Sequence, residues 1–223
     1  MKNLLLSALI CLQVFSIHPE INIINYDESH KDAVMELVFQ DPYKFFCGSD
    51  AVTRGFMPEE LFISENRKGM ETVLNNPLQI KKVLINGGKV IGFAEFCKSR
   101  ELNLESLKPM IEAQGLPFDE NQFMAAMPYL KRTNAECEEF ALIECMAVSR
   151  EFRGKGHGKA LIKLALHEIK TLWPALKQVR LNVNATNEVA RKLYESEGFV
   201  ASETQPAHLV MMNVIQYEKS LYQ

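Results

Sequence analysis

The sequence has no excess of charge of one sign. Lys and Arg together number 25 against 28 Asp and Glu, which gives a net charge of -3 and a pI near 6.0. Proteins that bind nucleic acid or an anionic lipid surface through their overall field are usually strongly basic. The balance therefore argues against both partners, and any anion-binding site in this chain must be built by local geometry.

Paired cysteines are also absent from the sequence. None of the five forms a C-x-x-C pair, and no His–Cys cluster has the spacing of a zinc site; they are Cys11, Cys47, Cys97, Cys137 and Cys145. Cys97 and Cys145 lie in apolar runs, where a free cysteine packs as a small hydrophobic residue. We expect neither a disulfide framework nor a metal site.

Long hydrophobic runs are limited to one segment, Leu4–Phe15, which is too short, and interrupted by Ser7 and Gln13, for a stable membrane span. Lys2 before it and Ser16 after it fit the charged start and the cleavage site of a secretory signal. An extra N-terminal helix or strand packed on the domain fits equally well. We therefore treat residues 1–20 as an apolar leader and residues 21–223 as one domain, which is long enough to bury a substantial core.

The rest of the chain alternates between strand-like and helix-like patterns, without an internal repeat or a low-complexity tract. The predicted strands are Ile21–Tyr26, Ile80–Ile85, Val90–Cys97, Phe140–Val148, Val179–Val183, and a closing hairpin of Phe199–Ala201 with Leu209–Tyr217. The predicted helices are 30–39, 58–74, 156–172 and 187–197, and Asp41-Pro42 should end the first of them and begin a loop. Asn86-Gly87-Gly88 favours a tight hairpin. This order indicates an α/β fold with a mixed sheet.

The segment from Lys98 to Glu139 differs from its surroundings. It is polar and carries Pro109, Pro117 and Pro128. Its pattern predicts two short helices, at 104–113 and 120–130. Structureless connections of this length are uncommon unless they are functional or disordered, so we regard about 98–139 as a helical insertion.

The most informative stretch runs from Glu144 to Leu161, where an apolar strand leads through a glycine-rich loop into a helix. Glycines let backbone N–H groups approach a ligand closely, and the amides and dipole of a helix start favour phosphate oxygens. Arg153, Lys155 and Lys159 add positive charge there. Neither the Walker loop nor the dinucleotide fingerprint fits, because position 160 is Ala and position 159 is Lys. A phosphate-bearing ligand of another kind is expected.

A third pattern does fit. Arg153-x-x-Gly156-x-Gly158 resembles the acyl-CoA pyrophosphate loop of the GNAT superfamily of acyl-CoA-dependent N-acyltransferases. Asn187-x-x-Ala190-x-x-Leu193-Tyr194-x-x-x-Gly198-Phe199 resembles the second motif of that family, and Val90–Ala94 and Val179–Val183 are similar to its third and fifth strands. The resemblance covers about residues 21–217. It implies a single-domain GNAT-like fold, with a mostly antiparallel central sheet flanked by helices.

The resemblance also implies roles for particular residues. Met146, Ala147 and Val148 would pair with the pantetheine arm of acetyl-CoA as if it were an added strand. The pyrophosphate would be held, through amides more than side chains, by Phe152, Arg153, Gly154, Lys155, Gly156, His157, Gly158 and Lys159. Asn187 would touch the coenzyme arm or cap its own helix. Tyr194 would protonate the departing thiolate, unless it is an ordinary core tyrosine.

Glu144 is the candidate general base. It is the only carboxyl side chain between Phe140 and Val148, and alternation along a strand places it on the same face as Met146 and Val148. Burial would raise its pKa, as a base working near pH 7 requires. A structural glutamate is the alternative, and some family members use a chain of waters instead. The amide of Met146 would polarise the thioester carbonyl.

The 98–139 insertion departs from the family pattern, in which a tight hairpin usually joins these two strands. Two interpretations stay open. It forms a lid over the acceptor site, with Phe118, Phe123, Met124 and Tyr129 as contacts, or it is a helical decoration of the surface.

These observations predict an N-acetyltransferase that uses acetyl-CoA and no metal, and that acts on a small-molecule or peptide amine. A non-catalytic CoA-binding sensor or partner module on the same fold is the alternative. The chain is expected to be a monomer or homodimer. Because acetyl-CoA is a cytoplasmic metabolite, we expect a cytoplasmic protein, or a secreted or periplasmic one if Met1–Ser16 is a cleaved signal.

Overall fold

The computed structural model describes residues 21–46, 57–100, 139–202 and 214–221, together with Val52 and Gly55. Its centre is one seven-stranded sheet with the order β1-β2-β3-β4-β5-β7-β6. The strands are β1 (Ile21–Asn25), β2 (Ile80–Asn86), β3 (Lys89–Arg100), β4 (Glu139–Val148), β5 (Gln178–Asn184), β6 (Val200–Ala201) and β7 (Val214–Ser220). Every neighbouring pair is antiparallel except β4 and β5, which run parallel. The mixed, mostly antiparallel sheet predicted from the sequence is therefore confirmed.

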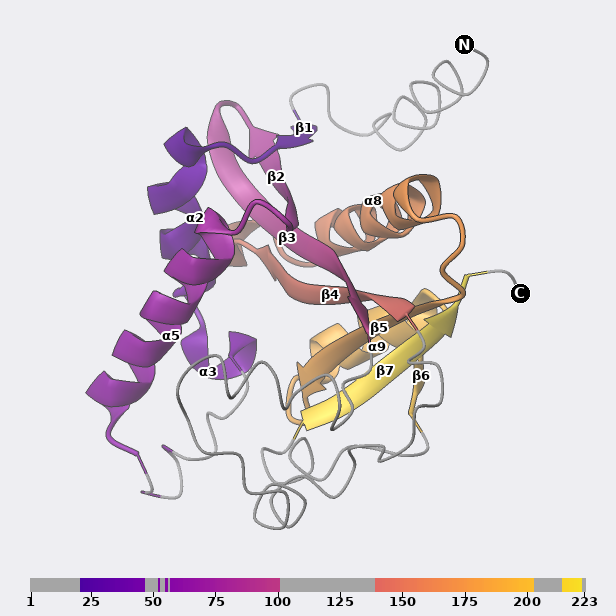
Figure 1. Ribbon diagram of the computed structural model, residues 1–223. Coiled ribbons are helices and arrows are strands. Elements are labelled where there is room, and N and C mark those ends of the chain that lie inside the picture. Colours follow the sequence, from indigo (N-terminus) through magenta and orange to yellow (C-terminus); the bar gives the residue numbers. More distant parts are fainter. Residues whose placement is uncertain are drawn as a thin grey trace, which may run out of the picture.

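Helices cover both faces of this sheet (Figure 1). The helical elements are a short 3-10 turn η1 (Glu28–His30), α2 (Lys31–Val38), α3 (Pro42–Phe45), α5 (Glu59–Asn75), a second 3-10 turn η2 (Arg150–Phe152), α8 (His157–Leu172) and α9 (Glu188–Ser196). Buried side chains of α2 and α5 pack with Val83 and Phe93 on one face, and those of α8 and α9 pack with β5 and β7 on the other. Among the described residues, no helix combines the length and the apolar character needed to cross a membrane.

Local sequence explains why several of these elements start and stop where they do. Asp27 accepts a hydrogen bond from the Ser29 amide, and His30 accepts one from the Asp27 amide, so the two form a capping box at the start of η1. Asn86 pairs with Lys89 across the β2–β3 turn, and both intervening glycines have positive φ (54° and 79°). A two-residue turn of this kind requires that conformation, so the predicted hairpin is confirmed.

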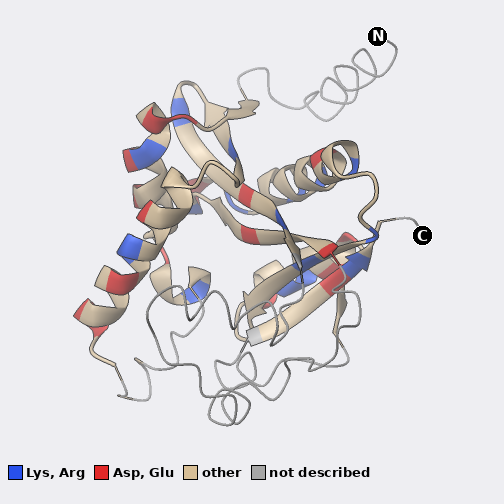
Figure 2. Cartoon of the chain, in the orientation of Figure 1, with Lys and Arg blue, Asp and Glu red and all other residues tan. Residues whose placement is uncertain are grey.

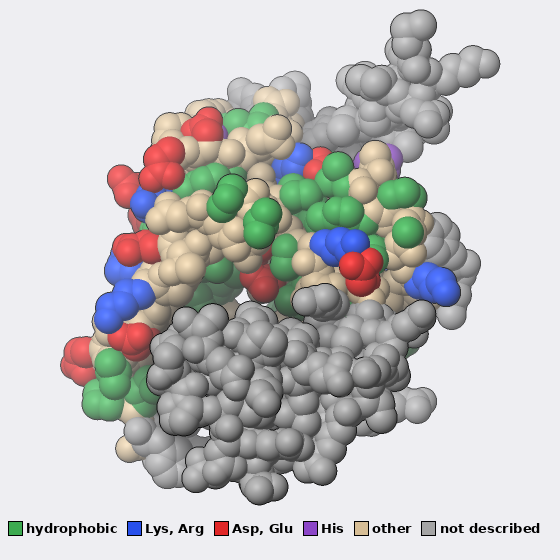
Figure 3. Space-filling view, viewed as in Figure 1, with side chains coloured by type: hydrophobic (Ala, Val, Ile, Leu, Met, Phe, Trp, Pro, Cys, Tyr) green, Lys and Arg blue, Asp and Glu red, His purple; other side chains and the backbone are tan. Residues whose placement is uncertain are grey.

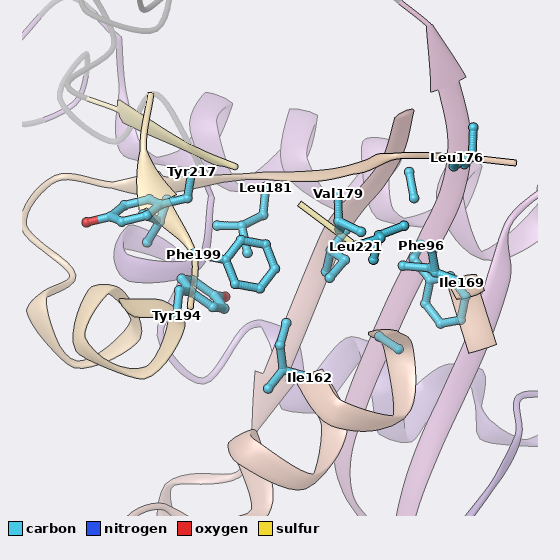
Figure 4. Close-up of a cluster of buried hydrophobic side chains, with 14 residues drawn as sticks. Phe96, Ile162, Ile169, Leu176, Val179, Leu181, Tyr194, Phe199, Tyr217 and Leu221 are labelled. Atoms are coloured by element: carbon cyan, nitrogen blue, oxygen red, sulfur yellow. The ribbon is translucent and has the colours of Figure 1, made fainter. Parts of the chain in front are cut away.

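The largest apolar core lies between α8, α9 and the β5–β7 half of the sheet (Figure 4). Its fully buried side chains include Phe96 from β3, Leu181 from β5 and Tyr217 from β7. Tyr194 of α9 packs there with ring centroids 6.0 Å from Phe199 and 6.4 Å from Tyr217. This core fixes α9 against the sheet and thereby sets the position of one wall of the site described below.

Some boundaries differ from the prediction. Residues 42–45 form the short helix α3 where a loop was expected, because Pro42 at the first helical position has the φ that a helix requires. β3 and β4 remain paired out to Arg100 and Glu139, so the two strands include the ends of the expected insertion. The two helices predicted between them, and the leader at 1–20, lie outside the described residues.

Charged side chains of both signs are interspersed over the molecule. Figure 2 shows acidic and basic residues alternating along α2 and α5, and the space-filling view in Figure 3 shows the two signs side by side along the same edge. Ion pairs such as Lys68–Glu65 on α5 and Lys82–Glu168 between β2 and α8 follow from this mixing. The surface of the described part thus matches the balanced composition.

Candidate active site

Two neighbouring strands separate in the middle of the sheet. β4 and β5 pair at three positions, Ala141–Val179, Leu142–Arg180 and Ile143–Leu181. Beyond Ile143, β4 stays paired to β3 as far as Val148, and β5 stays paired to β7 as far as Asn184. Residues 144–148 of β4 and 182–184 of β5 therefore do not pair with each other. Their facing edges leave room for a ligand to lie between them.

A cavity of about 370 Å³ lies along this part of β4. Its wall contains the following residues that the sequence predicted for the site: Met146, Ala147, Val148, Arg153, Gly154, Gly156, Gly158, Lys159, Asn187 and Tyr194. These residues come from β4, from the loop before α8, from the first turn of α8, and from α9 with its cap. The fold therefore brings together, around one cavity, side chains that are separated by up to 48 positions in the sequence.

The glycine-rich loop gives the cavity a helix N-terminus. Gly154 and Gly156 have φ of 74° and 85°, and Gly156 is the residue that immediately precedes α8. These left-handed conformations are costly for residues with a side chain. The first amides of α8 have no partner within the helix and carry the positive end of its dipole. A side chain at Gly158 would come within 3.1 Å of Leu193, so glycine there also allows α8 to approach α9.

The three expected cations are largely held by other groups. Arg153 donates from Nε to the carbonyl of Val148 (2.8 Å) and pairs with Asp41. Lys159 Nζ lies 2.8 Å from Glu197 Oε1, and the Lys155 ammonium lies over the ring of Phe152 at 5.2 Å. An anion in this cavity would consequently depend on backbone N–H groups more than on free positive side chains.

Phe152, Lys155 and His157 do not line the cavity wall. Phe152 packs against a buried cluster that includes Leu84 and Leu161, and the ring of the buried His157 lies 6.1 Å from it. Their side chains support the loop from behind.

Asn187 occupies the N-cap position of α9. Its Oδ1 accepts a hydrogen bond from the Ala190 amide (3.3 Å), and its Nδ2 donates one to the Lys44 carbonyl (3.3 Å). The same residue lines the cavity. The cap, which was one of the two roles expected for it, is present, and the residue also ties α9 to α3.

Tyr194 faces the cavity from the buried side of α9. Its side chain is 8% exposed, and burial raises the pKa of its phenol well above the ordinary value, with a smaller contribution from Cys145. The phenol therefore keeps its proton at pH 7 and is available to donate it.

Glu144 lies at a bulge of β4. Glu95 of β3 pairs with Cys145 and the next residue, Phe96, pairs with Ile143, so Glu144 is the extra residue. The simple alternation expected from the sequence is therefore wrong at this point. Met146 and Val148 pack toward α8. The Glu144 carboxyl lies instead beside Glu95 and Cys97: an oxygen of each carboxyl and the Cys97 sulfur are all within 4.8 Å of one another.

The Glu144 side chain nevertheless reaches the site. It lines a smaller cavity of about 60 Å³ that shares Met146, Asn187 and Tyr194 with the larger one. Gln79 Nε2 donates a hydrogen bond to its Oε2 (2.7 Å). Although the side chain is exposed on one side, the protein around it removes enough water to raise its pKa, and the nearby Glu95 carboxyl acts in the opposite direction.

Sequence reasoning missed one whole wall of the larger cavity. Leu37 and Val38 at the end of α2, and Asp41, Lys44 and Phe45 around α3, lie there. Their sequence carries no glycine-rich or capping signal that points to a ligand. Val189, Ala190 and Leu193 also line it, and these lie within the second motif, which could have identified them.

Comparisons with known proteins agree with this geometry. Residues 63–199 match the family model described as the acetyltransferase (GNAT) family. No curated protein matches the sequence significantly.

Several solved structures share the fold. One is the PaiA N-acetyltransferase from Thermoplasma acidophilum in complex with coenzyme A (15% identity, 90% of this chain and 98% of that chain, TM-score 0.54). A second is Arabidopsis thaliana NAA60 in complex with acetyl-CoA (14% identity, 91% and 99%, TM-score 0.53). A third is the ribosomal-protein-S18-alanine N-acetyltransferase from Escherichia coli (14% identity, 91% and 95%, TM-score 0.51). At these identities the likeness concerns the fold.

Proposed function

The chain belongs to the GNAT acetyltransferase family, and on this basis we propose that it transfers an acetyl group from acetyl-CoA to a primary amine, which attacks the thioester directly. The observation that carries the proposal is the cavity along the part of β4 that β5 leaves unpaired, with the glycine-rich start of α8 in its wall. A thioester with a long polar arm and a diphosphate fits such a site better than a compact ligand would.

The binding residues are assigned by their position along the cavity. The first amides of α8, at His157, Gly158 and Lys159, would hold the pyrophosphate. Backbone groups of Met146 and Val148, on the edge of β4 that β5 leaves unpaired, would pair with the pantetheine arm. Two solved structures with this fold contain coenzyme A or acetyl-CoA, which supports the same ligand here.

Catalytic roles follow from the ionisation of the side chains around the same cavity. Acetyl-CoA supplies the activated acetyl group as its thioester. Glu144 would take a proton from the acceptor amine, and Tyr194 would give a proton to the departing thiolate. The Met146 amide would donate to the thioester oxygen as negative charge develops on it. Both side chains line the smaller cavity, which supports these two roles.

The acceptor is proposed to be a primary amine on a small molecule or a peptide. The wall of the smaller cavity, where it would react, is mostly polar and includes Glu144, Asn182 and Asn184. A cationic ammonium group would be attracted to the Glu144 carboxylate before it loses its proton.

Two measurements test the proposed function. Calorimetry with coenzyme A should detect binding to the folded protein. Thiol release from acetyl-CoA should accelerate with at least one member of a panel that contains polyamines, free amino acids, a peptide with a free N-terminus, and the same peptide N-blocked with an internal lysine. Binding without turnover on any amine would favour a non-catalytic CoA-binding module, and no binding of coenzyme A would refute both.

A further inference from the structure

Glu95 is a fully buried acid that the proposed mechanism does not use. It lies in β3 between Ala94 and Phe96, and its side chain is 0% exposed. Neither carboxyl oxygen has a hydrogen-bond partner at normal distance among the described residues. An ionised carboxylate in such a place costs several kcal/mol because it has lost its water without gaining a partner.

The bulge of β4 places a second carboxyl beside it. Oxygens of Glu95 and Glu144, together with the Cys97 sulfur, lie within 4.8 Å of one another. A regular ladder would have put residue 144 opposite a single partner on β3, whereas the bulge turns it toward Glu95. The bulge therefore brings the two carboxyls together.

No cation among the described residues neutralises this pair by direct contact. The charge of Lys81 of β2 acts on Glu95, but its ammonium donates to the carbonyls of Leu74 (2.9 Å) and Asn76 (2.7 Å). Cys97 of β3 and Cys145 of β4 are the other titratable groups that face Glu95. Helices α2 and α5 pack apolar side chains, among them Met70 and Leu74, on this face. The surroundings do not supply a charge that would allow both acids to ionise.

Two carboxyls so close together, one of them fully buried, cannot both carry a charge near neutral pH. At neutral pH the pair therefore keeps one proton. This proton is mainly on Glu95, which is buried, because Glu144 reaches solvent and accepts a hydrogen bond from Gln79. In agreement with this, burial and the Glu144 carboxyl raise the pKa of Glu95 to about 8, and burial raises that of Glu144 as well.

We propose that Glu95 and Glu144 act as one carboxyl pair with a single shared proton, in which Glu95 is a positioning residue that holds the proton and so keeps Glu144 charged. This inference rests on the proposed function, because it gives Glu95 a role in the deprotonation of the amine.

The proton balance of that step is simple. The N–H bond of the acceptor ammonium breaks, an O–H bond forms on Glu144, and the freed lone pair of the amine attacks the thioester carbonyl. The pair then holds two protons and no charge, which the poorly hydrated site favours. Glu144 returns its proton to solvent after the product leaves, because its carboxyl is exposed on that side.

Infrared spectroscopy of the whole chain tests the pair without any substrate. A band from a protonated carboxylic acid should persist at pH 7 in the wild type and disappear as the pH rises through about 8. Glu95→Gln should remove this band, while Glu71→Gln, a change at an exposed acid of α5, should leave it in place. Absence of the band at pH 7 in the wild type, or its persistence in Glu95→Gln, would overturn the proposal. The wild-type titration needs no variant to fold.

A kinetic measurement tests the role, with the fastest acceptor of the amine panel. The kcat/KM of the wild type divided by that of Glu95→Gln should rise several-fold from pH 7 to pH 9. Over this range Glu95 ionises in the wild type, and its negative charge makes Glu144 a stronger base. The glutamine of the variant cannot ionise, so the variant lacks this effect. The titration of the amine cancels in this ratio. A flat ratio alongside the infrared result would overturn the positioning role. Full activity of Glu144→Gln would instead refute the base assignment in the proposed function.

Discussion

Asp41 forms an ion pair with Arg153 across the wall of the cavity, and so joins the start of α3 to the glycine-rich loop 112 residues further along the chain. The same carboxylate also pairs with Arg150. Asp41 is therefore a negative charge in the wall of an expected anion site, and it is tolerated there because two guanidinium groups surround it. The contact fixes the loop from a part of the chain in which the sequence shows no ligand-binding signal.

We expect Asp41→Asn to lower the free energy of unfolding by about 1 kcal/mol, since it weakens two partly exposed ion pairs. The hydrogen bond from Arg150 and the charge of Arg153 lower the pKa of Asp41 from its ordinary value to about 2. A lowered pKa contributes stability that is present above about pH 4 and is lost as the pH falls toward 2. Denaturant unfolding between about pH 4 and pH 2 should therefore show that the wild type and Asp41→Asn become closer in free energy of unfolding as the pH falls. Asp32→Asn, at an exposed acid of α2, is the control and should change little.

Gly156→Ala should weaken coenzyme A binding by about tenfold, because a residue with a Cβ at φ 85° costs roughly 1–2 kcal/mol and would pull the first amides of α8 out of line. Calorimetric titration measures the effect. Gly88→Ala is the matched control, since Gly88 has a similar φ of 79° in the β2–β3 turn, also with open space around it. Equal binding by Gly156→Ala and the wild type would argue against the amides of α8 as the diphosphate site.

Much of the site could be predicted because its signals are local. The turn, the glycines and the helix start at 153–158 depend on neighbouring residues, and so does the Asn187 cap of α9. The bulge at Glu144 could not be predicted, since it depends on how β4 pairs with β3, which a single strand does not encode. The wall formed by α2 and α3 was missed for a similar reason: Asp41 and Phe45 reach the cavity through tertiary packing alone.

Glu95 is a different case, because its signal was present. It is the only acid in the predicted strand Val90–Cys97, just as Glu144 is the only one in Phe140–Val148. An isolated acid in an apolar strand suggests either an error in the predicted strand or a special role. Only the register between the two strands shows that the two acids meet.

The buried state of Glu95 predicts a distinctive pH dependence of stability. Its pKa is raised from 4.5 to about 8, so the folded chain binds a proton there that the unfolded chain does not. The stabilisation is complete below about pH 4.5 and is lost as the pH rises through 8. The free energy of unfolding of the wild type should accordingly fall relative to Glu95→Gln by about 1.4 kcal/mol per pH unit across this range. Urea titrations at several pH values would measure this slope, and parallel curves for the two proteins would contradict it.

Tyr194→Phe should lower kcat by about 10²-fold while leaving coenzyme A binding and stability almost unchanged, because the variant keeps the buried ring and removes only the proton donor. Tyr217→Phe is an informative contrast. The Tyr217 hydroxyl donates to Glu195 (2.7 Å) and accepts from Arg191 (3.2 Å), so its loss should cost stability and spare the rate. Thiol release under saturating substrates, together with thermal unfolding, separates the two outcomes. An unchanged kcat in Tyr194→Phe would return this residue to an ordinary core role.

Glu144→Gln should produce the largest kinetic defect, a fall in kcat/KM of about 10²- to 10⁴-fold at pH 7. The amide keeps the shape of the side chain and can still hydrogen-bond Gln79, so the fold and the affinity for coenzyme A should be retained. Raising the pH should restore part of the rate with amines of low pKa, because these lose their proton to water without help from the protein. Glu139→Gln, at an exposed acid at the start of the same strand, controls for the change in charge. If Glu144→Gln and Glu139→Gln reacted equally fast with every amine, deprotonation would have to occur without this carboxylate, through a chain of waters or a residue from elsewhere in the site.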